Sequence, residues 1–157
     1  MRKLTAALLV ALVALLGFAA VFVMGGTLRA QVYIRTASAA DYPEAYGAIR
    51  GLLASGSAPQ LFDGSPLADD PNGYTLVDVT VTLANRGLFP AEWLDISAEP
   101  APGDVAVYAL TGEGTDIAAR DSGQVNLKLI TTAPADAGRT IVIQYYVYGM
   151  ARRISVK

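Results

Sequence analysis

Hydrophobic residues follow three different patterns along the chain. Apolar side chains are nearly continuous from Leu4 to Met24, are spaced as on a helix between residues 41 and 55, and alternate with polar ones from Tyr74 onward. These patterns are typical of a membrane or buried helix, an amphipathic helix and half-buried strands, respectively. They divide the chain into residues 1–26, 27–73 and 74–157.

Residues 1–26 are predicted to be an N-terminal transmembrane anchor. Leu4–Met24 comprises 21 residues without a charge, and a helix of that length spans roughly the 30 Å of a hydrocarbon core. A small-x-small cleavage signal is not evident after the run, because Leu28 stands where cleavage after Ala30 needs a small residue. We therefore expect contact with the membrane through residues 4–24, with cleavage at a less obvious site as the alternative.

The anchor predicts a single-pass protein of the cell membrane whose C-terminal domain is extracytoplasmic. Basic residues are nearly balanced across the apolar run, with Arg2 and Lys3 before it and Arg29 and Arg35 after it. The positive-inside rule therefore does not decide the orientation. The very short N-terminal tail and the lack of cysteine favour an exported domain.

Residues 27–73 are predicted to connect the anchor to the β domain. A short strand is expected at 31–36 and a helix at 41–55, with Asp41 as its N-cap and Gly56 as its stop. One face of this helix is apolar: Tyr42, Tyr46, Ile49, Leu52 and Leu53. We expect that face to cover one side or end of the β domain, while docking to a partner or to the membrane surface is the alternative.

The loop that follows contains a candidate calcium site made of Asp63, Asp69, Asp70 and Asn72. Carboxylate and amide oxygens are the ligands that calcium prefers. The spacing does not match an EF-hand loop. Tight turns require the same residue types, so turn formation explains these residues equally well.

From Tyr74 the period of the pattern is two, which predicts about seven short strands. Val77, Val79, Val81 and Leu83 share one face, and Leu94 and Ile96 lie opposite Trp93 and Asp95. Further strands are expected in the stretches VAVYAL, IAAR, QVNLKLITT and RTIVIQYYVYGMARRISVK, the last with a type II′ turn at Gly149–Met150. The predicted fold is all-β: an immunoglobulin-like antiparallel β-sandwich with one short helix, preceded by an N-terminal transmembrane helix.

The stretch VDVTVTLANRGLFPAEWLDISAEPAPGD resembles the first half of bacterial extracellular immunoglobulin-like modules of the CARDB type. The shared features are a β-branched strand that ends in Asn-x-Gly, a further strand and a Pro-Gly turn, over about residues 75–105. The resemblance implies a surface-exposed spacer or adhesion domain, and it brings no catalytic residues.

The amino-acid composition limits the kinds of catalytic and metal site that the chain can form. The chain has no cysteine and no histidine, which excludes disulfides and thiolate metal sites and removes the usual general base. Residues 27–157 carry 10 basic and 14 acidic side chains, a net charge of −4, and the arginines are scattered. We therefore expect no enzyme activity, no cofactor and no nucleic-acid binding.

The C-terminal hairpin carries the candidate binding surface. If Tyr145 and Val147 face the core, then Gln144, Tyr146 and Tyr148 point outward, and Arg152 or Arg153 could stack on them across the hairpin. Cross-strand aromatic pairs that stabilise the hairpin are the structural alternative. The sequence predicts a non-enzymatic envelope or surface protein that contacts another envelope protein. The alternative is a module that binds a glycan or a peptide through these tyrosines.

Overall fold

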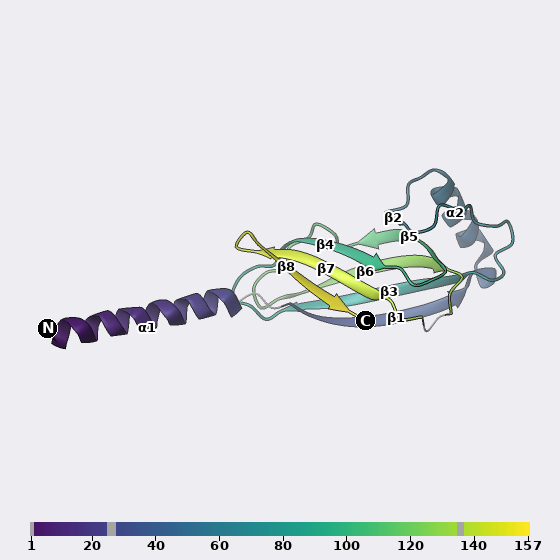
Figure 1. The fold of residues 1–157 in the computed structure, drawn as a ribbon. Coiled ribbons are helices and arrows are strands. Elements are labelled where there is room, and N and C mark those ends of the chain that lie inside the picture. The colour runs from purple at the N-terminus through teal and green to yellow at the C-terminus, as the bar shows by residue number, and fades with distance from the viewer. Residues whose placement is uncertain (1, 25–27, 135–136) are drawn as a thin grey trace.

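The structure is a computed structural model that describes residues 2–24, 28–134 and 137–157 (Figure 1). Its elements, in chain order, are the helix α1 (Arg2–Met24), β1 (Leu28–Ser38), a 3₁₀ turn (Ala39–Asp41), α2 (Pro43–Ala54), β2 (Gln60–Leu61), β3 (Thr75–Asn85), β4 (Glu92–Glu99), β5 (Asp104–Thr111), β6 (Ser122–Thr131), β7 (Thr140–Val147) and β8 (Met150–Val156).

The strands form two antiparallel sheets. The larger has the order β1-β3-β6-β5-β2, and the smaller has the order β4-β7-β8. A mostly-β, sandwich-like fold with two antiparallel sheets was predicted and is confirmed at that level. The strand expected at 31–36 is longer, because β1 pairs with β3 over all of its 11 residues.

The main core lies between the two sheets. The β3 residues that were predicted to share an inward face, Val77, Val79, Val81 and Leu83, are each at most 1% exposed. They pack with inward residues of the small sheet, including Leu94 and Ile143. Burying one such side chain contributes roughly 1.5–3 kcal/mol, so the alternating pattern supplies the main stabilisation of the fold.

Helix α2 covers the outer face of the large sheet at one end, as predicted. Tyr46 and Ile49 are buried in a second cluster that includes Ile130 of β6. Leu129 belongs to the main core, so two adjacent residues of one strand are buried in two different layers. The Tyr46 hydroxyl donates to the Ala68 carbonyl at 2.7 Å, which fastens the helix to the loop before β3.

The predicted N-cap of α2 is wrong. Asp41 lies inside the 3₁₀ turn, and Tyr42 occupies the cap position without a side-chain hydrogen bond. Ser38 caps the preceding 3₁₀ turn, where its hydroxyl oxygen accepts from the Ala40 N–H. The chain therefore turns before the helix begins, and Asp41 sits too early to cap it.

Helix α1 extends away from the end of the sandwich (Figure 1). Its leucine and valine side chains between Leu8 and Leu16 are each more than half exposed. Among the described residues, no helix combines the length and the apolar character that a membrane span requires. Residues 25 and 26 of the predicted anchor lie outside the described residues.

Candidate functional site

The outer face of the small sheet presents part of the predicted binding surface. In β7, Tyr145 and Val147 are buried, whereas Gln144 and Tyr146 are exposed. This alternation was predicted and is confirmed. Tyr146 keeps 44% of its surface exposed, so its ring is available on this face.

The hairpin turn differs from the predicted one. Val147 pairs with Met150, so the two turn residues are Tyr148 and Gly149, not Gly149 and Met150. Both have positive φ, 53° and 68°, which defines a type I′ turn. The Tyr148 ring packs edge-on against Phe89 with a centroid separation of 4.1 Å, so Tyr148 lies at the tip of the hairpin, against the β3–β4 loop.

The two arginines of β8 point to opposite faces. Arg153 pairs in register with Gln144 and shares its outer face, where it forms an ion pair with Glu99 at 3.2 Å. Arg152 is opposite Tyr145 and is half-buried on the inner side. Of the five predicted residues, the structure therefore brings Gln144, Tyr146 and Arg153 together and separates Arg152 from them.

The sequence interpretation missed Trp93, the most exposed aromatic side chain of the small sheet. Glu92 pairs with Tyr146 and Asp95 with Gln144, so two residues of β4 face one residue of β7 in a β-bulge. Trp93 lies in this bulge with φ of 52°, where glycine is usual because a Cβ is strained. Its side chain is 72% exposed. A large aromatic residue on the polar face of its strand was the signal available in the sequence.

The loop between β5 and β6 holds the bulge in place. The Trp93 N–H donates to a carboxylate oxygen of Asp116 at 2.9 Å. The Gly114 N–H donates to the Leu94 carbonyl at 2.7 Å, and Ala91 forms a two-way bridge with Ile117. These bonds fix the backbone on both sides of Trp93, so the bulge does not depend on contacts of the Trp93 ring.

A pocket of about 280 Å³ lies beside this bulge. Its walls are Trp93, Leu94, Asp95, Glu113, Gly114, Gln144 and Tyr146. Two aromatic rings, two carboxylates and one amide therefore converge on a single concave surface. Such a surface can stack on a flat or cationic group and accept hydrogen bonds from it.

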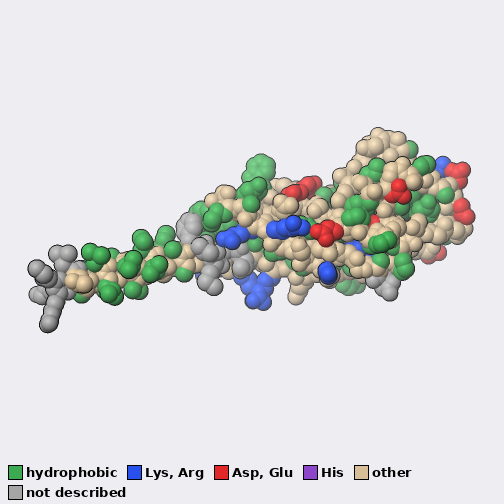
Figure 2. Space-filling model, in the orientation of Figure 1, with side chains coloured by type: hydrophobic (Ala, Val, Ile, Leu, Met, Phe, Trp, Pro, Cys, Tyr) green, Lys and Arg blue, Asp and Glu red, His purple; other side chains and the backbone are tan. Residues whose placement is uncertain are grey.

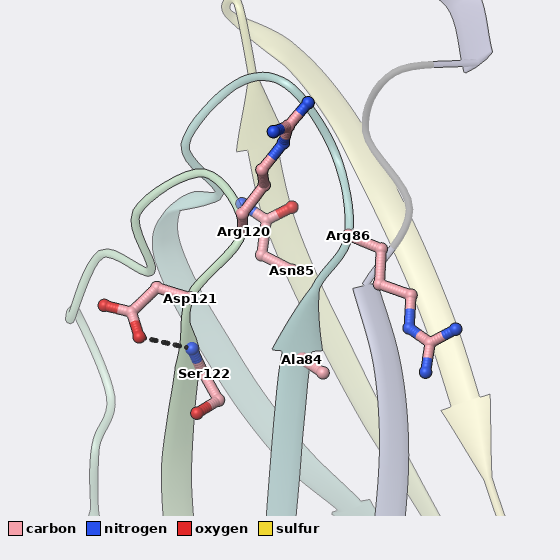
Figure 3. A pocket seen from close by; sticks show the side chains of 6 residues that line it. All are labelled: Ala84, Asn85, Arg86, Arg120, Asp121 and Ser122. Atoms are coloured by element: carbon pink, nitrogen blue, oxygen red, sulfur yellow. Dashed lines mark hydrogen bonds between the residues drawn. The ribbon is translucent and has the colours of Figure 1, made fainter.

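A second pocket lies at the end of the large sheet, where β3 ends opposite the first residue of β1 (Figure 3). It measures about 440 Å³ and is lined by Ala84, Asn85, Arg86, Arg120, Asp121 and Ser122. Figure 3 shows the two arginine side chains pointing away from each other. Asn85 has a structural role here, because its amide donates to the carbonyls of Phe89, Ile117 and Ala118 and accepts from the Gly87 N–H.

The candidate calcium ligands take part in local contacts. Asp63 accepts from the Ser65 N–H, and Asp70 accepts from both nitrogens of Asn72. Asp69 forms an ion pair with Arg50 of α2. Within residues 2–24, 28–134 and 137–157, no group of three acidic residues is placed to hold a metal ion.

Comparisons with known proteins give no family. No protein-family model and no curated protein matches the chain. Among solved structures, the chain is similar to the X-ray structure of Northeast Structural Genomics Consortium target SoR45. The TM-score is 0.45 at 16% identity, over 83% of this chain and 82% of that one. A likeness at this level carries no argument about function.

Proposed function

We propose that this chain is a non-enzymatic envelope protein, held at the cell membrane by its N-terminal helix, whose extracytoplasmic immunoglobulin-like domain binds another protein. The observation that carries this proposal is the exposed aromatic surface of the small sheet, where Trp93 and Tyr146 line one pocket. Tryptophan and tyrosine that are exposed on a rigid scaffold are enriched at protein interfaces.

Two features support attachment to a membrane. The first is a feature of the sequence alone: the uncharged run Leu4–Met24 has the length of a hydrocarbon core, whereas among the described residues no helix meets the requirements of a span. The second is the end of the sandwich from which β1 begins, where Arg86 and Arg120 flank the pocket of Figure 3. Leu88, Tyr148 and Met150 belong to the neighbouring loop and hairpin tip and are exposed. Basic and apolar side chains together suit the headgroup region of a bilayer.

The distribution of charge on the visible face agrees with this orientation (Figure 2). Most basic side chains on this face lie near α1 and along the middle of the domain, with one at the far end, whereas acidic side chains lie along the middle and gather at the end far from α1. An anionic membrane surface on either side of the bilayer attracts the basic end and repels the acidic one, so the charge supports attachment and does not choose the side. The domain would then stand upright on the membrane, with its acidic end pointing away.

Membrane attachment is tested by fractionation and protease protection of the full-length chain. We expect the protein to remain in the membrane pellet after alkaline carbonate extraction, and protease added to spheroplasts to digest residues 28–157. A double variant, Leu12→Arg with Leu15→Arg, should move the protein to the soluble fraction, because each arginine at a helix centre disfavours insertion by about 2.5–3.5 kcal/mol. Wild-type protein in the soluble fraction would contradict the anchor.

Partner binding is tested by site-specific photo-crosslinking in intact cells. A photoreactive phenylalanine analogue at Trp93 or Tyr146 should give discrete protein adducts. The same analogue at Tyr33, an aromatic position of β1 that is 59% exposed on the other sheet, is the matched control and should give none. Equal adducts at all three positions, or none at any, would contradict the proposed interface.

A glycan-binding module is the second candidate, and the aromatic walls of the same pocket are the observation that favours it. Flat rings with adjacent amide and carboxylate groups can also hold a sugar. Glycan-array binding by the full-length chain, lost in Tyr146→Ala without a change in stability, would favour the glycan over the protein partner.

A further inference from the structure

Two adjoining pockets follow the outer edge of β4. The pocket with Trp93 and Tyr146 shares Asp95 and Glu113 with a neighbour of about 300 Å³. That neighbour is also lined by Gln60, whose side-chain amide pairs with the backbone of Ala98 and closes this edge of the sandwich. Asp95 and Glu113 therefore contribute to the walls of both pockets.

The walls of both pockets carry negative charge without a basic residue. Their lining contains Asp95 and Glu113 but neither lysine nor arginine. Arg153, which lies on the same sheet face, forms its ion pair with Glu99 instead. Carboxylates on a concave surface between low-dielectric walls attract a cation more strongly than carboxylates on a flat surface do.

The aromatic ring in this pocket is kept there against the preference of the backbone. Trp93 occupies a left-handed conformation that a bulky residue seldom adopts, and the hydrogen bond from its N–H to Asp116 holds it. The bulge interrupts the alternation of buried and exposed residues in β4. Glu92 and Trp93 are neighbours in the chain and neither is buried, whereas Leu94 is buried. Strained residues of this kind cluster at ligand-binding positions.

We propose that the Trp93–Tyr146 pocket binds an arginine or lysine side chain from a segment of the partner protein. The cation would stack on the ring of Trp93, the aromatic residue that binds cations best, and pair with Asp95 and Glu113. This inference rests on the proposed function, since it names the chemistry by which the same surface recognises its partner. Charge complementarity favours a cation over a neutral sugar, because a sugar gains hydrogen bonds but no net attraction from two carboxylates.

Trp93 is the single tryptophan of the chain, so its fluorescence reports directly on the pocket. The test titrates the full-length protein in non-ionic detergent with the capped tripeptides acetyl-Gly-Arg-Gly-amide and acetyl-Gly-Lys-Gly-amide. The citrulline analogue, which has nearly the shape of arginine but no charge, is the control. We expect saturable changes with the arginine and lysine peptides, weaker binding at high salt and no change with citrulline.

Charge-removing variants then locate the site. Asp95→Asn and Glu113→Gln keep side-chain shape and should each weaken binding by about three- to fivefold, as expected for loss of one partly exposed charge pair. Trp93→Phe should weaken peptide binding about twofold or more, because phenylalanine is the poorer partner for a cation. Calorimetry measures this variant, which has no tryptophan fluorescence. Glu44→Gln is the control, because Glu44 is an exposed carboxylate of α2 that lines neither pocket, and it should leave binding unchanged.

Each outcome has one meaning. The cation site would be overturned by any of three results. The citrulline peptide could bind as well as the charged ones, no peptide could bind, or Trp93 fluorescence could respond to oligosaccharides and not to the charged peptides. If the peptides fail while crosslinks at Trp93 persist, the interface stands and its chemistry is different. If the peptides bind while no partner is crosslinked, the pocket stands and the proposed function fails.

Discussion

Arg139 and Asp104 form a buried ion pair that joins the two sheets. Asp104 is the first residue of β5 in the large sheet, and Arg139 directly precedes β7 in the small one. The guanidinium donates from Nε and Nη2 to both carboxylate oxygens, at 2.8–3.1 Å, and the two side chains are 2% and 1% exposed. A charge buried this deeply must be paired, so each side chain needs the other where the two sheets meet at this end.

Removing one member of this pair should destabilise the fold strongly. We expect Asp104→Asn to lower the free energy of unfolding by about 3–5 kcal/mol, because it leaves the Arg139 charge buried without its partner. Glu99→Gln is the control, because it removes an ion pair in which both side chains are 59% exposed, and it should cost at most about 1 kcal/mol. Urea unfolding followed by circular dichroism measures both. Equal losses for the two variants would contradict the structural role of the buried pair.

The same pair predicts how stability depends on pH. Burial alone raises the pKa of Asp104, but hydrogen bonds from Arg139, Thr131 and the Ala101 N–H outweigh it and hold the pKa below its usual value. A group whose pKa is lowered in the folded state contributes stability that is complete above its unfolded pKa, about 3.9. That contribution is lost as the pH falls through the lower folded value.

The measurement is the urea midpoint of the wild-type protein and of Asp104→Asn between pH 7 and pH 2.5. We expect the difference in stability between them to stay constant down to about pH 4 and to shrink below it. A difference that shrinks between pH 7 and pH 5 would mean that another group titrates there.

The strands were the most predictable part of the fold, because their signal is local. Val77 to Leu83 and Ile143 to Val147 alternate over several residues, and a buried face fixes which side points inward. Even the wrong turn left the faces of the hairpin correct. The predicted turn shifts the pairing of β7 with β8 by two residues, so that Ile154 would oppose Tyr145 instead of Ile143. An even shift keeps every side chain on its own face.

The turn itself was missed because local preference and packing disagree. A Gly149–Met150 turn places glycine where positive φ is needed and spares Tyr148 from it. The structure instead accepts a positive φ at Tyr148, whose ring gains its contact with Phe89. Similarly, the expected strand in IAAR is reduced to a bridge at Ile117, because its partner is the single residue Ala91.

The pocket and the ion pair could not be read from the sequence, since each depends on residues far apart in the chain. Asp104 and Arg139 are separated by 35 positions. Trp93 becomes a wall of the pocket because Asp116, 23 residues later, fixes the bulge. The sequence placed Trp93 and Asp95 on one polar face, but it did not show that Glu113 closes that face into a hollow.

Two glycines of the loop that supports the bulge should differ sharply in their tolerance of alanine. Gly112 and Gly114 both have positive φ, 91° and 71°. A Cβ at Gly112 would lie 2.7 Å from the Gln124 carbonyl oxygen, whereas a Cβ at Gly114 would meet nothing within 4 Å. We expect Gly114→Ala to cost about 1 kcal/mol from backbone strain. Gly112→Ala should cost at least about 1 kcal/mol more, because backbone has to move. Thermal unfolding of the two variants checks the order, and equal melting temperatures would contradict the close approach of β6.

Trp93 should be replaceable by glycine without loss of stability. Glycine adopts the left-handed conformation of the bulge freely, and the exposed ring contributes little burial. We therefore expect Trp93→Gly to be about 1 kcal/mol more stable than Trp93→Ala, which removes the same ring but keeps the strain. Both variants should lose affinity for the arginine tripeptide to the same extent, as measured by calorimetry. This combination would mean that tryptophan is present for recognition at a cost to the fold. If Trp93→Gly instead unfolds at lower urea than Trp93→Ala, the ring stabilises the bulge and its role is structural.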